Sequence, residues 1–167
     1  IEEEALCLKA RKRLEQNPGY MYAGLRSFLD LERNFEFHTI LHSSDKAEGI
    51  CEWDIQLENE SLGKPGCRWY TLAQVAAKSA YLYLKGWLTG DKNVFTLVNH
   101  AASSDADRDK FRNAMAVSLG SLFRKHGKPV FELTLPSLDA AALGEYLIFK
   151  EQAIMVHSKS ILYLYKL

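Results

Sequence analysis

The sequence has few cysteines, no net charge and no long apolar run, and each of these absences excludes a class of protein. Its three cysteines, Cys7, Cys51 and Cys67, show no CxxC spacing, which indicates free thiols in a reducing cytoplasm and not a disulfide framework. Lys and Arg number 21, as do Asp and Glu, so we expect no partner bound mainly by long-range electrostatics, such as nucleic acid or an anionic membrane. No apolar run approaches the roughly 20 residues of a membrane-spanning helix, and no signal peptide is recognisable.

The remaining composition is that of a compact globular domain. Of the 167 residues, 47% are hydrophobic and 25% are charged. We predict one domain over residues 1–167, with a helical lead-in over 1–34 and a sheet with its helices over 35–167. Because the chain begins with Ile1 and not Met, we expect it to be part of a longer protein or to have a processed start.

Hydrophobic periodicity predicts helices that alternate with strands. Alternation of this kind is typical of an α/β fold, here an αβα sandwich with a mainly parallel, doubly wound sheet of about four or five strands. We expect the strands at 94–98 and 130–135 to be neighbours or to be separated by one strand. The predicted strands are 35–41, 94–98, 130–135 and 160–165; the predicted helices are 2–16, 20–31, 43–63, 71–83, 103–126 and 136–154.

The segment 53–64 carries the strongest indication of chemistry. It reads Trp-Asp-Ile-Gln-Leu-Glu-Asn-Glu-Ser-Leu-Gly-Lys, a helix that ends at Gly63 with Glu60 in its last turn. This segment resembles the one that carries the catalytic glutamate of phosphoglucose isomerases, Trp-x-x-Gln-Leu-x-x-Glu-Ser-x-Gly-Lys. A carboxylate there can act as a general base on a sugar carbon. The alternative is a solvated helix end with a glycine stop.

Two later segments resemble the same family in the same order. Asp91-Lys92 precedes a predicted strand, and Lys128-Pro129 precedes another strand and the helix motif Leu-Gly-x-x-Leu-Ile at 143–148. The family's Asp-Gln-His-Ser, however, falls on Ala-Lys-Ser-Ala at 77–80, so its ring-opening histidine is missing here. The family pattern also requires a strand before Ala77, where periodicity favours a long helix from Thr71, and the sequence leaves this conflict open.

The chain therefore resembles the second sugar-isomerase (SIS-type) domain of phosphoglucose isomerase. The resemblance implies aldose–ketose isomerisation of a hexose 6-phosphate, with Glu60 as the base and with Ser61 and Lys64 binding the substrate. It implies no metal and no organic cofactor, a cytoplasmic location, and a homo-oligomer or a second SIS-like domain as partner. The family's phosphate-gripping Ser/Thr cluster and its late catalytic lysine have no match in this chain.

The histidines and the missing features leave alternatives open. His100 follows a strand and can substitute for the missing histidine in substrate binding, or can be an ordinary loop residue. His38 and His42 share one strand face, but a metal site there needs a third ligand. The competing function is a non-catalytic sugar-phosphate-binding or assembly domain. A double-stranded-RNA-binding module, suggested by the alanine pattern at 73–81, lacks the necessary basic residues.

Overall fold

The computed structural model describes residues 16–63, 69–100 and 106–165. The chain forms two compact units, one made of residues 35–144 and the other of residues 1–34 together with 145–167. The helix predicted over 2–16 lies outside the described residues except for its last residue. Within the described ranges, no helix is long and apolar enough to cross a lipid bilayer.

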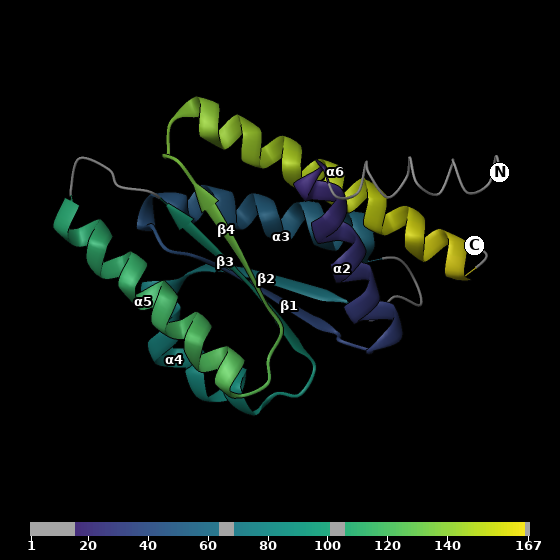
Figure 1. The fold of residues 1–167 in the computed structure, drawn as a ribbon, viewed down its shortest axis with the longest axis horizontal. Coiled ribbons are helices and arrows are strands. Elements are labelled where there is room, and N and C mark those ends of the chain that lie inside the picture. Colours follow the sequence, from purple (N-terminus) through teal and green to yellow (C-terminus); the bar gives the residue numbers. More distant parts are fainter. Residues whose placement is uncertain (1–15, 64–68, 101–105, 166–167) are drawn as a thin grey trace. The chain divides into compact units, whose positions relative to one another are not determined.

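A sheet of four parallel strands forms the centre of unit 35–144, in the order β2-β1-β3-β4 (Figure 1). β1 pairs with both β2 and β3, so that Phe37 lies opposite Tyr70 on one side and Asn93 on the other. The predicted strands at 94–98 and 130–135 are direct neighbours, as expected. The strands are β1 (Phe37–His42), β2 (Tyr70–Val75), β3 (Asn93–His100) and β4 (Val130–Leu135).

Helices cover both faces of this sheet. α3 packs over β1 and β2 on one face, whereas α4 and α5 lie on the opposite face (Figure 1). The chain crosses from β1 to β2 in one direction and from β2 back past β1 to β3 in the other. The predicted doubly wound αβα sandwich is therefore confirmed. The helices of this unit are η1 (Asp45–Ala47), α3 (Glu48–Leu62), α4 (Ala76–Thr89) and α5 (Ala106–Lys125).

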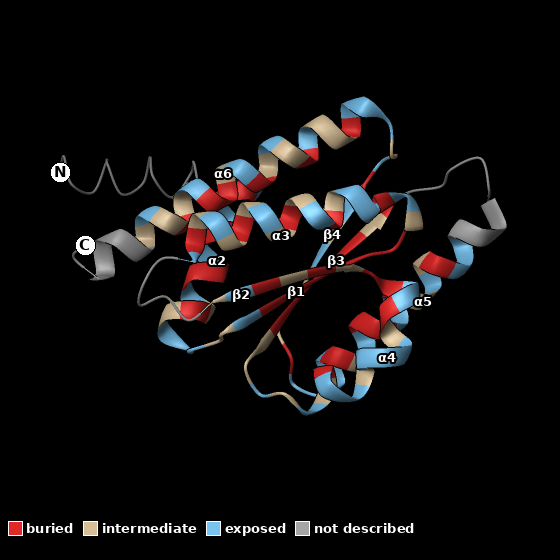
Figure 2. Cartoon of the chain, turned by 180° about the vertical axis from the view of Figure 1, so that it is seen from behind, coloured by how far each residue is buried: buried red, intermediate tan, exposed pale blue. Residues whose placement is uncertain are grey.

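The apolar core lies between the sheet and the α4–α5 layer. Phe95 of β3 stacks on Phe123 of α5 with ring centroids 3.9 Å apart, and Trp87 of α4 meets both rings edge-on. Figure 2 shows the central strands as mostly buried and the helices as buried along one side. The predicted apolar face of the helix 103–126 is only partly buried, because Phe111 is 69% exposed.

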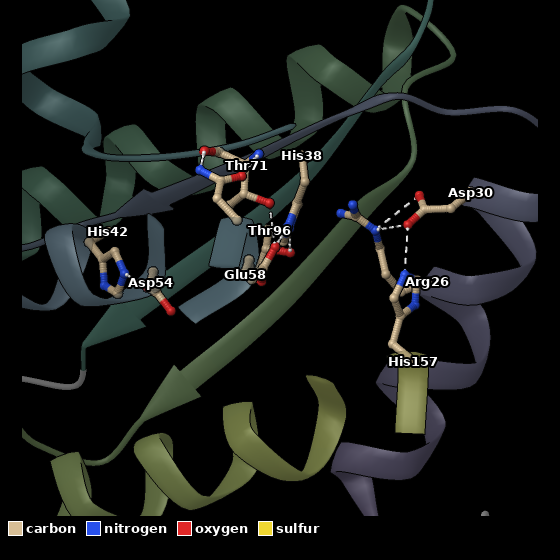
Figure 3. A network of polar contacts seen from close by, with 10 residues as sticks. Arg26, Asp30, His38, His42, Asp54, Glu58, Thr71, Thr96 and His157 are labelled. Carbon is tan, nitrogen blue, oxygen red and sulfur yellow. Dashed lines mark hydrogen bonds and ion pairs between the residues drawn. The ribbon is translucent and has the colours of Figure 1, made fainter. Parts of the chain in front are cut away.

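The second unit contains α2 (Pro18–Glu32) and most of α6 (Ala140–Tyr165). Asn17 caps α2 by accepting hydrogen bonds from the backbone amides of Gly19 and Tyr20. The two helices contact each other through polar and aromatic groups: Ser27 hydrogen-bonds to His157, and the rings of Tyr22 and Phe149 lie 5.4 Å apart. Asp30 accepts from Arg26 of the same helix and lies 3.2 Å from His157 Nε2 (Figure 3). The apolar stripe predicted on helix 20–31 instead faces outward, since Met21, Leu25 and Phe28 are about half exposed.

One prediction about secondary structure is wrong, and the structure decides one conflict that the sequence leaves open. Residues 160–165, expected to form a strand, continue α6, which runs as one helix of 26 residues. The helix expected from Thr71 begins only at Ala76, and Tyr70–Val75 form β2. The hydrogen bonds of β2 to β1 outweigh the helical pattern of its side chains, a case of tertiary context that overrides local preference. The strand that the family pattern requires before Ala77 is therefore present.

Candidate functional site

The helix that carries Glu60 has a defined beginning and a defined end. Ser44 caps the short η1 helix that leads into α3, with its hydroxyl accepting from the amide of Lys46. Gly63 ends α3, and its amide donates to the carbonyl of Asn59 at 2.9 Å. A Cβ at position 63 would lie 2.2 Å from that same carbonyl oxygen, so only glycine fits. The predicted helix and its glycine stop are confirmed.

Glu60 lies in the last turn of α3 with its side chain exposed. We expected this carboxylate in a cleft beside Lys64, but the described residues leave it on an open helix end. Ser61, the next residue, is half-buried. Lys64 lies outside the described residues.

The backbone around Glu60 is firmly held although its side chain is exposed. The side-chain amide of Asn59 donates to the carbonyl of Thr71 at 3.0 Å, and its oxygen accepts from the Thr71 amide at 2.9 Å. Glu58 is buried and accepts a hydrogen bond from the Thr71 hydroxyl at 2.5 Å. The helix end that carries Glu60 is therefore fixed on β2, while the Glu60 carboxylate itself is exposed.

His100 lies at the other end of the sheet, as the last residue of β3. It is buried, its ring stacks on that of His42 at 5.9 Å, and its amide donates to the hydroxyl of Ser43. His42 in turn donates to the buried carboxylate of Asp54 at 2.9 Å. These groups lie where β1 and β3 end and the chain leaves in opposite directions, the usual ligand position in an open α/β sheet.

The structure does not bring His100 and Glu60 together. Glu60 follows Asn59, which is bonded to Thr71 near the start of β2, level with Val94 on β3. From Val94 to His100 the strand advances by about 20 Å at roughly 3.3 Å per residue. Within one copy of this unit, His100 and Glu60 therefore cannot contact the same sugar phosphate, and His100 does not replace the missing histidine at this site.

His38 and His42 are each hydrogen-bonded to a buried carboxylate of α3. His38 donates to Glu58 at 2.7 Å and its second ring nitrogen lies 2.8 Å from the hydroxyl of Thr96, while His42 is paired with Asp54 (Figure 3). Among the residues that the structure describes, no three His, Cys, Asp or Glu side chains are placed to hold a metal ion together. Each histidine thus has its own acidic partner on α3.

Asp54, Glu58 and Asn59 were not singled out from the sequence. A signal was available: α3 buries Cys51, Asp54, Glu58 and Leu62, so its inner face carries two acids four residues apart. β1 carries two histidines with the same separation on the face it turns to α3. A spacing of four places both acids on one face of the helix and both histidines on one face of the strand, which allows the two faces to pair.

The first turn of α4 holds the positions at which the family pattern has Asp-Gln-His-Ser. Residues 77–80 follow directly after β2, so the expected strand–helix junction is present, but Ser79 stands where the histidine would be. The structure places Asp91 and Lys92 before β3, Lys128 and Pro129 before β4, and Gly144 in α6.

Comparison with known proteins gives the fold alone. No protein-family model and no curated protein matches the chain. Among solved structures, the chain is similar to hypothetical protein TT0462 from Thermus thermophilus, with a TM-score of 0.72 and 20% sequence identity. The match covers 87% of this chain and 40% of that one, so the chain spans less than half of the length of this neighbour.

Proposed function

We propose that the chain is an SIS-type domain of a sugar-phosphate isomerase that resembles phosphoglucose isomerase, with Glu60 as the catalytic base. The observation that carries the proposal is the end of α3, where an exposed carboxylate follows an anchored residue and precedes an obligatory glycine. A glycine stop is also common at a solvated helix end, whereas the two bonds of Asn59 to Thr71 fix this helix end on β2. The order of the segments along the parallel sheet supports the same assignment.

In the proposed reaction Glu60 moves one proton. Its carboxylate takes the proton from C2 of the open-chain glucose 6-phosphate, which leaves an enediolate, and returns it to C1. A second proton passes from O2 to O1 by way of solvent or an acid group, which gives fructose 6-phosphate. Proton transfer of this kind needs no metal and no organic cofactor. Ser61 and Lys64, which follow the base in sequence, would bind and orient the sugar phosphate. His100 has no role in this proposal because it lies at the other end of the sheet.

The proposal requires a second protein surface that covers Glu60. Glu60 is exposed in the described part of the chain, and a base of this kind works best when bulk water is excluded. A second SIS-like domain or another copy of the chain, in a cytoplasmic assembly, would cover it and would supply the acid that the missing histidine provides in the family. The absence of that histidine also favours a second candidate, a sugar-phosphate-binding domain with no catalytic role.

Replacement of Glu60 by Gln in the full-length protein distinguishes the two. The rate of fructose 6-phosphate isomerisation should fall by about 10²–10⁴-fold, the usual effect of a positioned general base, while the circular dichroism spectrum stays unchanged. The matched control is Glu52→Gln, since Glu52 is also an exposed glutamate of α3. Equal rates for Glu60→Gln and Glu52→Gln would exclude the catalytic assignment and would leave the binding domain.

A further inference from the structure

The last two turns of α3 are attached to three strands by a buried polar network. Glu58 accepts from the Thr71 hydroxyl of β2 at 2.5 Å and from a ring nitrogen of His38 of β1 at 2.7 Å. The other ring nitrogen of His38 bonds to Thr96 of β3 at 2.8 Å (Figure 3). All four side chains are at most 3% exposed. Glu58 therefore has a fixed position relative to β1, β2 and β3.

Asn59 adds a second attachment at the edge of the sheet. Among the described strands, β2 lies at the edge of the sheet and has β1 as its single neighbour. The amide group of Asn59 bonds to both the N–H and the C=O of Thr71, so it supplies the pairing that a further strand would give. The Asn59 carbonyl then accepts from Gly63, which ties the helix end to the same residue.

These contacts flank Glu60 on both sides in sequence. Glu58 and Asn59 directly precede Glu60 in the sequence. The hydrogen bond from the Gly63 amide to the Asn59 carbonyl joins the residues on its two sides. A catalytic group must be held within about 0.5 Å of its productive position, and a shift of about 1 Å can cost 10²-fold in rate. Because the Glu60 side chain is exposed, its own packing cannot hold it, and the backbone must be fixed by its neighbours.

We infer that Asn59 and Glu58 are positioning residues for Glu60, an inference that rests on the proposed isomerase function. Buried polar pairs give little net stability compared with apolar residues of the same shape, but their directional bonds fix one arrangement. The hydrogen bonds of Glu58 and Asn59 fix the orientation of the end of α3, which carries Glu60. Its effect is expected in the chemical step, because substrate binding also uses groups other than Glu60.

The test compares two asparagine substitutions in the full-length protein. Asn59→Ala should lower kcat for fructose 6-phosphate by about 10- to 100-fold with KM unchanged. Asn17→Ala is the matched control: Asn17 also bonds backbone amides, but it caps α2 in the other unit. Its kcat should equal that of the wild type, while its denaturation midpoint should fall as it does for Asn59→Ala. A lower kcat at equal loss of stability is a result that a merely structural role would not give.

The outcomes separate the inference from the function on which it rests. Wild-type kcat for Asn59→Ala, together with an inactive Glu60→Gln, overturns the positioning role and leaves the isomerase. Wild-type kcat for Glu60→Gln overturns both. If Asn59→Ala does not fold, Asn59→Asp decides, because it keeps an acceptor for the Thr71 amide and replaces the donor to the Thr71 carbonyl with a carboxylate oxygen that this carbonyl repels. A reduced kcat at unchanged KM then supports the inference, and a wild-type kcat contradicts it.

Discussion

Replacing Gly63 by alanine places a methyl group against the backbone of α3. The new Cβ would lie 2.2 Å from the carbonyl oxygen of Asn59 and 3.3 Å from its carbonyl carbon. Relief of this contact requires the helix end to move by about 1 Å, which breaks the 2.9 Å hydrogen bond from Gly63 to Asn59. The backbone angle φ of −73° is ordinary, so the strain comes from the contact and not from the conformation.

The expected loss of stability is about 2 kcal/mol. Overpacking typically costs about 1–3 kcal/mol and a lost hydrogen bond about 1 kcal/mol, whereas the smaller entropy of the unfolded alanine chain returns up to about 1 kcal/mol. Gly49→Ala is the control, because Gly49 lies in the first turn of α3 with nothing within 4 Å of an added Cβ. It should stabilise the protein by up to about 1 kcal/mol.

Urea denaturation followed by far-UV circular dichroism measures both effects. The midpoint should fall for Gly63→Ala and rise for Gly49→Ala, with the same slope against urea concentration. A Gly63→Ala variant as stable as the wild type would refute the reasoning, because it would mean that the end of α3 can rearrange freely. Glu60 would then not be held by its neighbours.

Three further predictions concern the core, the buried thiol and assembly. Phe123→Ala should lower the free energy of unfolding by about 3–5 kcal/mol, because Phe123 is buried and stacked on Phe95, whereas Phe111→Ala on the same helix should change it by less than about 0.5 kcal/mol. Burial, and then the charge of Asp54, raises the pKa of Cys51 from 9.0 to about 12. The folded thiol thus stays protonated and should resist alkylation at pH 8; since the unfolded thiol ionises first, its contribution to stability should be lost as pH rises from about 9 to about 12. Light scattering should show association, because the proposed site needs a second surface; a monomer at high concentration would contradict this.

Much of the fold follows from the sequence because its strands are short, apolar and clearly bounded. The prediction for β4 matches its observed limits, and that for β3 is correct within two residues. The apolar run of β3 fits a strand buried on both faces, whereas β4 is an edge strand of the described sheet whose Glu132 and Thr134 are exposed. Gly63 is also correctly predicted as the stop of α3, because a glycine after the last periodic residue is a common helix end.

The errors arise where tertiary contacts decide. β2 has polar and apolar residues at a spacing that also fits a helix, and only its pairing with β1 and the bonds of Asn59 select the strand. The end of α6 is rich in Leu and Tyr, residues that a strand and a buried helix share, so the pattern alone does not distinguish them. The apolar side of α2 faces outward because its polar side is buried: Arg26 pairs with Asp30, and Ser27 hydrogen-bonds to His157.

The candidate site was predictable only in part. The motif around Glu60 is contiguous in sequence, so its place at the end of a helix could be predicted. The separation of Glu60 and His100 could not be predicted from either segment, because it depends on the strand order. That order places the two residues at opposite ends of the sheet. His38 pairs with Glu58, 20 positions later, and His42 pairs with Asp54, 12 positions later. These pairs can be identified only when the packing of α3 on β1 is known.

The most direct test of the central claim follows the proton that Glu60 is proposed to move. The full-length protein is incubated with fructose 6-phosphate in D₂O, and NMR records deuterium at the carbons next to the carbonyl. We predict that the wild type and Glu52→Gln introduce deuterium during isomerisation, because a carboxylate base exchanges its proton with solvent, and that Glu60→Gln introduces none above the uncatalysed rate. Deuterium incorporation by Glu60→Gln at the wild-type rate would contradict the account, since the proton would then be moved by another group.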